Sequence, residues 1–338
     1  MKYIVCEQPG SFAMKEKEPP IPREGEALVR IRRVGICGTD LHAFEGTQAY
    51  FSYPRILGHE LAAEVVEVKG NQAGINPGDP VVIMPYENCG TCIACKHGKT
   101  NCCSTLNVLG VHVDGGMQEY YRLPSRLLLP APGLSLSEMA LVEPLAIGGH
   151  AIRRAAIQAG EFVLVIGCGP IGIGTIRMAQ LAGAEVIAMD LNQDRLRYCQ
   201  DVLGVSHIVQ AADDPLHTIQ QITNQDLPTA VFDVTGSKKA LEQGIQYMAP
   251  GGRYVFIGLT KGELTFSHPY IHARESSLLC SRNATQEDME AIIQMLQEGK
   301  FPSSEYITHT VHFSEMMEQF GSWLQPETQV IKAMTVWE

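Results

Sequence analysis

Four cysteines at short spacing carry the clearest chemical signal in this sequence. Cys89, Cys92, Cys95 and Cys103 fall within one stretch of 15 residues. Four thiolates can hold Zn²⁺ tetrahedrally at about 2.3 Å, and two-residue spacers let one loop wrap the ion. A disulfide ladder is the alternative, but Cys-x2-Cys pairs in a large chain without a secretory leader more often bind metal or do redox chemistry. We therefore predict a structural zinc site, and the spacing alone does not choose between Cys102 and Cys103 as fourth ligand.

A second group of ligand-type residues consists of three in glycine-bordered loops and one carboxylate between apolar residues. Cys37 is part of GICGTDLH, His59 and Glu60 are part of ILGHE, and Glu143 is part of VEPLA. A catalytic zinc needs three protein ligands and one open position. Adjacent residues of a strand point to opposite faces, so His59 and Glu60 can face one ion only if the backbone there is not extended. From spacing alone, a core cysteine, a satisfied histidine and two surface carboxylates remain the alternative.

A glycine-rich motif points to a nucleotide. Gly167, Gly169 and Gly172 directly follow the apolar run FVLVI and open a helical pattern. Glycines let the backbone approach a pyrophosphate, and the N-terminus of the following helix attracts its negative charge. The motif therefore predicts a dinucleotide site.

Asp190 ends the next predicted strand, 18 residues after Gly172. There its carboxylate can accept hydrogen bonds from the adenosine ribose and would repel a 2′-phosphate. This favours NAD over NADP. Arg195 or Arg197 could instead hold a phosphate, and a solvated strand-end carboxylate is the structural alternative for Asp190.

Composition limits the class of protein. A chain of 338 residues exceeds one hydrophobic core, which favours two domains, and 45% hydrophobic residues with 32 glycines suit an α/β protein. A net charge of −11 repels nucleic acid and anionic lipid. The N-terminus lacks a signal-peptide core, and no apolar run approaches the ~18 residues of a membrane span. We expect a cytoplasmic protein that binds neither nucleic acid nor membranes.

The pattern of predicted secondary structure changes near the middle of the chain. Short β-type runs at Ala27–Val34, Ala62–Val68 and Pro80–Met84 predict a β-rich first part. From Phe162, apolar runs alternate with helical patterns that begin near Ile171, Gln193 and Lys238. This alternation predicts βαβ units on a parallel sheet. From Asp288 to Trp337 we expect two helices and a final strand in QVIKAMTVW, and the composition does not say which part this segment joins.

The motifs together resemble a known family. GICGTDLH, YPRILGHE, the cysteine cluster, DGGMQEYY, VEPLA, VIGCGPIG and DVTG occur in the order that marks the zinc-dependent medium-chain dehydrogenases, over nearly the whole chain. The polyol and sorbitol dehydrogenase-like branch and the hexonate (L-gulonate and L-galactonate) 5-dehydrogenases are the most similar. The resemblance implies an α/β fold in three parts. These are a GroES-like β-rich catalytic domain at 1–146 with a zinc lobe at about 86–105, a Rossmann domain with a doubly wound parallel sheet at 147–282, and a segment at 283–338 that rejoins the first domain.

The resemblance also implies residue roles. Cys103 becomes the fourth structural ligand, Cys37 and His59 become catalytic zinc ligands, and either Glu60 or Glu143 is the third. Asp40 would orient the ligand histidine. Thr39 resembles the relay hydroxyl and His42 a histidine near the ribose, with turn and surface roles as alternatives. The cofactor-binding residues would be Gly167, Gly169, Pro170, Ile171, Gly172, Asp190, Arg195 and Thr235.

The expected reaction follows from these roles. Zinc would stabilise the alkoxide of a substrate hydroxyl, whose carbon releases hydride to nicotinamide, while the proton leaves through Thr39, Glu143 or the zinc water. Arg282, in SRNAT, is a candidate fork for a substrate carboxylate, with an interdomain salt bridge as its alternative. The other candidates for lining the substrate pocket are Tyr50, Phe51, His272 and Asn283.

We therefore expect two zinc ions per chain and NAD-dependent oxidation of a secondary hydroxyl in a polyol or sugar acid. Threonine or a simple alcohol is the alternative substrate, and an NAD-binding sensor is the alternative class of protein. Metal-free quinone reductases of the same fold lack these ligands. Family analogy favours a homodimer or homotetramer.

Overall fold

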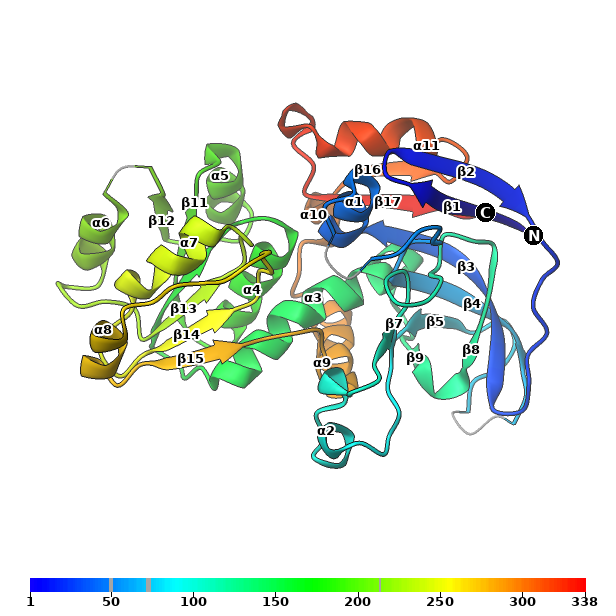
Figure 1. The fold of residues 1–338 in the computed structure, drawn as a ribbon, viewed down its shortest axis with the longest axis horizontal. Coiled ribbons are helices and arrows are strands. Elements are labelled where there is room, and N and C mark those ends of the chain that lie inside the picture. The colour runs from blue at the N-terminus through cyan, green and yellow to red at the C-terminus, as the bar shows by residue number, and fades with distance from the viewer. Residues whose placement is uncertain (49–50, 71–73, 213) are drawn as a thin grey trace. The chain divides into compact units, whose positions relative to one another are not determined.

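The computed structural model describes residues 1–48, 51–70, 74–212 and 214–338, so Tyr50 lies outside the described residues. These residues form two compact units (Figure 1). Unit 1 contains Met1–Pro144 and Thr285–Glu338, and unit 2 contains Leu145–Ala284. In the described ranges we find no helix with the length and apolar character that crossing a bilayer requires.

Unit 1 is built on β-sheets. Its strands are β1 (Lys2–Gln8), β2 (Ser11–Glu16), β3 (Glu26–Ile36), β4 (Glu60–Val68), β5 (Pro80–Ile83), β6 (Tyr86–Glu87), β7 (Asn107–Val108), β8 (Tyr120–Pro124), β9 (Leu128–Pro130), β16 (Ile307–His312) and β17 (Lys332–Val336). The main sheet has seven strands in the order β16-β17-β3-β4-β5-β9, with β8 also paired to β3. Pairs β1·β2 and β6·β7 stand apart from it. The three strands predicted in this part are confirmed as β3, β4 and β5.

The last stretch of the chain rejoins unit 1, because β17 pairs antiparallel with β3 and parallel with β16. This settles the question that composition left open. The helices of unit 1 are α1 (Gly38–Glu45), α2 (Ile93–Lys96), α9 (Gln286–Gln297), α10 (Ser303–Tyr306) and α11 (Met316–Gln319), with 3-10 turns η1 (Thr100–Cys102), η2 (Ser125–Leu127), η4 (Phe320–Leu324) and η5 (Pro326–Thr328). The prediction of two helices after Asp288 was too simple, because Gly299 and Pro302 separate α9 from short helical turns.

Unit 2 carries the predicted βαβ units. Its elements are β10 (Phe162–Ile166), α4 (Pro170–Leu181), β11 (Glu185–Asp190), α5 (Gln193–Asp201), β12 (His207–Gln210), α6 (Pro215–Ile222), β13 (Ala230–Asp233), α7 (Lys238–Gln243), η3 (Gly244–Tyr247), β14 (Arg253–Phe256), α8 (His268–Ala273) and β15 (Ser277–Cys280). Helix α3 (Leu136–Ala155) contains the boundary between the units.

The six strands of unit 2 are parallel and lie in the order β12-β11-β10-β13-β14-β15. The strand order reverses between β10 and β13, which is where open α/β sheets bind ligands outside the carboxyl ends of their strands. Buried side chains such as Leu164, Ile187 and Val231 form the core beneath this point.

Candidate metal and nucleotide sites

The glycine-rich loop lies at the reversal point of the unit 2 sheet, directly after β10. Gly167 has φ +98, and a Cβ there would lie 3.0 Å from Thr235 Cγ2. A Cβ on Gly172 would lie 1.8 Å from the Gly167 carbonyl oxygen, so only glycine allows the loop to pack on α4. Gly169 caps α4, and Pro170 occupies its first turn. The loop therefore exposes a helix N-terminus of the kind that binds a pyrophosphate.

Asp190 is held within this loop region. Its Oδ2 accepts a hydrogen bond from the Cys168 N–H at 2.6 Å, and its Oδ1 accepts one from the Asn192 N–H at 2.7 Å. The carboxylate thus ties the glycine-rich loop to the start of α5. A simple solvated carboxylate does not fit these contacts.

The two nearby arginines differ in their surroundings. Arg197 pairs with Asp194 at 2.8 Å. Arg195 Nη1 lies 3.7 Å from the position that a Cβ would take on Gly169, and it forms no ion pair with the described residues. Arg195 is therefore the cation beside the glycine-rich loop.

The four cysteines of the lobe converge. The sulfur atoms of Cys89, Cys92, Cys95 and Cys103 all lie within 4.8 Å of one another, and Cys92 Sγ is 3.5 Å from Cys95 Sγ. Sulfurs around a tetrahedral zinc would lie ~3.8 Å apart. All four are free thiols, and Cys102 is outside the group. These four sulfurs fit a closed zinc site. They do not fit the disulfide alternative, because none of the four cysteines is in a disulfide.

The lobe is already prepared for thiolates. Hydrogen bonds from the Thr91 N–H and hydroxyl and from the Cys92 N–H lower the pKa of Cys89 to about 5. Hydrogen bonds involving Cys95 and Ser104 lower the pKa of Cys92 to about 7. With these lowered pKa values the metal-free lobe is partly deprotonated at neutral pH. The thiolate is also the form that binds zinc.

We expect zinc uptake by this lobe at about pH 7 to release roughly one to two protons fewer than four ordinary thiols would release. Calorimetry in buffers of different ionisation enthalpy measures this number. Thr91→Val, which removes the hydroxyl donor, should increase the release. A release of about four protons from the unaltered protein would contradict the prediction.

The second ligand group also converges, in unit 1. Ligand atoms of Cys37, His59 and Glu60 lie within 4.8 Å of one another. Cys37 caps α1, and Glu60 is the first residue of β4, so His59 precedes the strand. Gly58, at φ +93, turns the backbone immediately before His59. His59 and Glu60 therefore reach the same point although they are adjacent, with the turn at Gly58 just before them.

Asp40 holds the two ligand loops together. Its Oδ2 accepts a hydrogen bond from the Cys37 N–H at 2.9 Å, and its Oδ1 accepts one from the Gly58 N–H at 3.1 Å. His59 Nδ1 lies 3.8 Å from Asp40 Oδ1, beyond hydrogen-bond distance. Asp40 therefore fixes backbone positions on both sides of the cluster, and its orientation of the histidine ring remains a prediction.

Glu60 and Glu143 occupy different surroundings. Glu60 lies with Cys37 and His59, whereas Glu143 is not in that mutually close group. Glu143, on α3, is 4% exposed and accepts a hydrogen bond from the Tyr86 hydroxyl. Burial raises the pKa of Glu143 to about 7.

A buried lysine, which sequence reasoning missed, completes the cluster. Lys332 Nζ donates to both Glu60 oxygens, at 2.6 and 2.7 Å, and to the Ile36 carbonyl at 3.2 Å. Glu60 is 0% and Lys332 1% exposed. A lysine inside the apolar run QVIKAMTVW was the available signal. Tyr86, the partner of Glu143, was missed as well.

The residues present fit a zinc ion. Cys37, His59 and Glu60 bring a sulfur, a ring nitrogen and a carboxylate oxygen within 4.8 Å of one another. His59 Nδ1 is buried and has no hydrogen-bond partner among the described residues. Thiolate, imidazole and carboxylate are also the ligand types that zinc prefers.

The remaining candidate residues from the sequence analysis lie at several separate places in the structure. Thr39 is half-buried on α1, and His42 is exposed, with Nδ1 3.1 Å from Thr47 Oγ1. In unit 2, Arg282 is exposed, and Asn283 has φ +52 and a buried Nδ2. The other two candidates are Phe51, which packs against Tyr53, and His272, which is exposed on α8. The proposed roles of all of these stay predictions.

Comparison with known proteins agrees with both units. Residues 23–133 match the alcohol dehydrogenase GroES-like domain, and residues 170–298 match the zinc-binding dehydrogenase family. L-galactonate-5-dehydrogenase of Escherichia coli K12 is 40% identical, with 99% of this chain and 98% of that protein covered. Sorbitol dehydrogenase of Halalkalibacterium halodurans is 33% identical, with 93% and 94% covered. An NADH-bound alcohol dehydrogenase structure from E. coli CFT073 superposes with TM-score 0.93 at 27% identity, covering 99% of both chains.

A GroES-like unit with a zinc-type ligand cluster, joined to a dinucleotide-binding unit, defines a zinc-dependent oxidoreductase. The chain belongs to the zinc-type medium-chain alcohol dehydrogenase family. Its relatives include dehydrogenases named for polyol and sugar-acid substrates.

Proposed function

We propose that this protein oxidises a secondary hydroxyl of a sugar acid to a ketone, with NAD as hydride acceptor. The observation that carries the proposal is the group formed by half-buried Cys37 and buried His59 and Glu60, with the Glu143 carboxyl nearby. The sequence resemblance associates a ligand set that includes a carboxylate with polyol, sugar and amino-acid alcohol substrates, so the metal site alone does not choose among them. The 40% identity to an L-galactonate dehydrogenase supports a hexonate as the substrate.

Each residue of the cluster has a physical task in this proposal. Cys37, His59 and Glu60 would hold zinc, and zinc would supply Lewis acidity that stabilises negative charge on the substrate oxygen. Lys332 compensates the charge of Glu60, and Asp40 keeps the two ligand loops in register.

Glu143 is the group that we propose holds the substrate proton. Burial raises the pKa of this carboxyl, and a carboxyl with a raised pKa is suited to general acid–base catalysis. The Tyr86 hydroxyl fixes the position of Glu143 Oε1. Thr39 and His42 remain candidates for passing the proton onward.

NADH formation with matched substrates tests the proposed function. The panel pairs L-galactonate and L-gulonate with the hexitols that lack the carboxylate, and adds threonine and simple alcohols. We expect turnover with a hexonate and a much lower kcat/KM with its hexitol. Arg282→Met should raise KM for the hexonate and leave the hexitol unchanged. Equal activity on hexitols, or activity on threonine alone, would overturn the sugar-acid assignment.

The cofactor choice is tested at Asp190. We expect Asp190→Ala to weaken NAD binding by about tenfold or more, since it removes hydrogen bonds to the ribose, and to change NADP binding far less. Because Asp190 also binds the N–H groups of Cys168 and Asn192, Asp190→Asn serves as the control that keeps one acceptor oxygen. Fluorescence titration with both nucleotides gives the ratio. An unchanged ratio would assign cofactor choice to Arg195 instead.

A further inference from the structure

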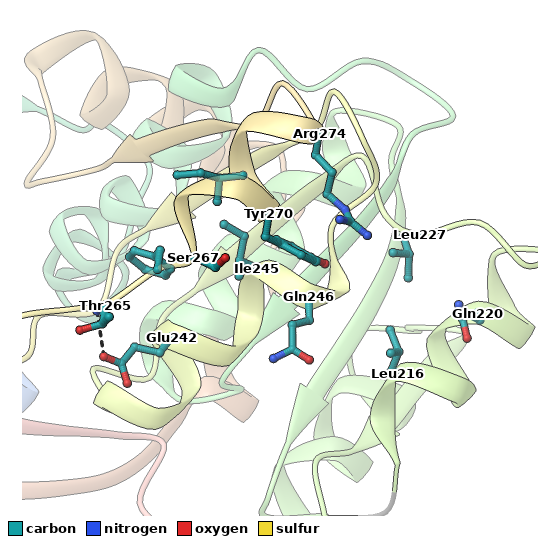
Figure 2. A pocket seen from close by; sticks show the side chains of 12 residues that line it. Leu216, Gln220, Leu227, Glu242, Ile245, Gln246, Thr265, Ser267, Tyr270 and Arg274 are labelled. Carbon is teal, nitrogen blue, oxygen red and sulfur yellow. Dashed lines mark hydrogen bonds between the residues drawn. The ribbon is translucent and has the colours of Figure 1, made fainter.

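Unit 2 contains a pocket of about 470 Å³ that the dinucleotide site does not explain. Its walls come from α6, from α7 with η3, and from α8 with the segment before it (Figure 2). Leu227 lies three residues before β13, and Arg274 lies three residues before β15. The strands are parallel, so both residues mark the amino-end edge of the sheet, whereas the glycine-rich loop follows the carboxyl end of β10. The pocket is therefore separate from the loop expected to bind NAD.

The pocket contains an arginine without an acidic partner. Arg274 forms no ion pair with any described residue, and its Nε is buried without a hydrogen-bond acceptor. Its guanidinium carbon lies 3.8 Å from the centre of the Tyr270 ring, and its carbonyl oxygen accepts a hydrogen bond from the Gly251 N–H at 2.6 Å. Stacking on an aromatic face fixes the guanidinium plane and leaves its N–H edge for a carboxylate or phosphate. Arg274 is thus an oriented cation that lacks an anion.

The acidic residue in the pocket does not fill that place. Glu242 Oε1 accepts the Thr265 N–H at 2.9 Å and pairs with Lys238 Nζ at 3.2 Å. These contacts lower the pKa of Glu242, so it is an anion whose charge is already balanced. The positive charge of Arg274 remains the unbalanced charge among the described lining residues.

Other lining groups suit a hydroxylated molecule. The Tyr270 hydroxyl and the amides of Gln246 and Gln220 make no side-chain hydrogen bond with the described part of the chain. Figure 2 shows Arg274 and Tyr270 extending side by side, with Gln246 below them and Gln220 across on α6. Ile245 and Leu227 add apolar surface. A pocket of this volume is within the range of small-molecule sites.

We propose that this pocket binds a small hydroxylated organic anion, whose carboxylate or phosphate is held by Arg274, at a site distinct from the dehydrogenase site. The guanidinium supplies paired N–H donors to the anion, and Tyr270, Gln246 and Gln220 supply hydrogen bonds to its hydroxyls. This ligand goes beyond the proposed oxidation, because none of these residues belongs to the zinc cluster or to the glycine-rich loop.

Calorimetry with two probes tests the proposal on zinc-loaded protein saturated with NADH. Gluconate presents a carboxylate and glucose 6-phosphate presents a phosphate on a similar hydroxylated chain, so the two arms identify the anion. We expect saturable binding of at least one probe, weakened about tenfold or more in Arg274→Met. Lys239→Met, which removes an exposed charge from α7 outside the lining, is the matched control and should bind as the unaltered protein does.

Activity and thermal unfolding of each variant show that it is folded. If Arg274→Met does not fold, Tyr270→Phe and Gln246→Leu carry the same test, with an expected weakening of about threefold to tenfold each. Three results overturn the proposal: no saturable binding of either probe, binding that the lining variants leave unchanged, or an equal loss in Lys239→Met.

Discussion

Cys37→Ser is expected to lower kcat/KM by about a thousandfold or more while the protein stays folded. Zinc contributes several kcal/mol of charge stabilisation to such reactions, and ~4 kcal/mol corresponds to a factor of about a thousand. Cys37 lies with His59 and Glu60, whereas the four lobe cysteines form their own group. Zinc content should therefore fall from two ions to one per chain. Turnover assays, metal analysis and circular dichroism of the same preparation measure all three quantities.

Cys102→Ser is the matched control for this experiment. Cys102 is an exposed cysteine beside the lobe, and it belongs to neither ligand group. This variant should keep both zinc ions and full activity. Loss of both zinc ions from Cys37→Ser, or full activity with a single ion, would contradict the assignment of two independent sites.

Lys332→Met should lower the free energy of unfolding of unit 1 by about 3–5 kcal/mol. Removing one partner of a buried ion pair leaves an uncompensated charge, and Glu60 is fully buried. Denaturant unfolding followed by tryptophan fluorescence measures this loss. Both tryptophans of the chain, Trp323 and Trp337, are buried in unit 1, so the signal reports on that unit.

Two further variants identify the cause of that loss. The double variant Glu60→Gln, Lys332→Met removes both charges and should recover most of the stability. Lys300→Met breaks an exposed pair with Glu298 and should cost less than about 1 kcal/mol. A Lys332→Met protein as stable as the Lys300→Met protein would show that Glu60 does not depend on its lysine.

Local sequence patterns predicted the strands, helix starts and turns that depend on interactions between residues close together in the sequence. Periodicity placed β3, β4 and β5, and the start of α5 at Gln193 follows from the capping Asn192, whose side chain accepts hydrogen bonds from the first turn. The glycine spacing of the nucleotide loop was readable because Gly172 has no room for a Cβ. Such features are encoded within a few residues of where they act.

Contacts across long sequence distances could not be predicted in the same way. Glu60 and its partner Lys332 are 272 residues apart, and Tyr86 and Glu143 are 57 apart. The spacing of these residues along the sequence does not indicate either contact. The pocket around Arg274 likewise combines residues of α6, α7 and α8, which are separate segments of the sequence. In this chain the candidate ligand residues that lie close together could be proposed from the sequence, and the lysine that pairs with Glu60 could not.

The return of the chain to unit 1 has a consequence for how the protein is made. Unit 2 is one continuous stretch, Leu145–Ala284, whereas unit 1 needs β17, with Lys332, from beyond that stretch. Domains fold as units while the polypeptide emerges from the ribosome. Unit 2 can therefore fold first, and Glu60 lacks its lysine until Lys332 has been synthesised. A nascent chain stalled after Ala284 and before Lys332 would contain all of unit 2 and yet lack the lysine that pairs with Glu60.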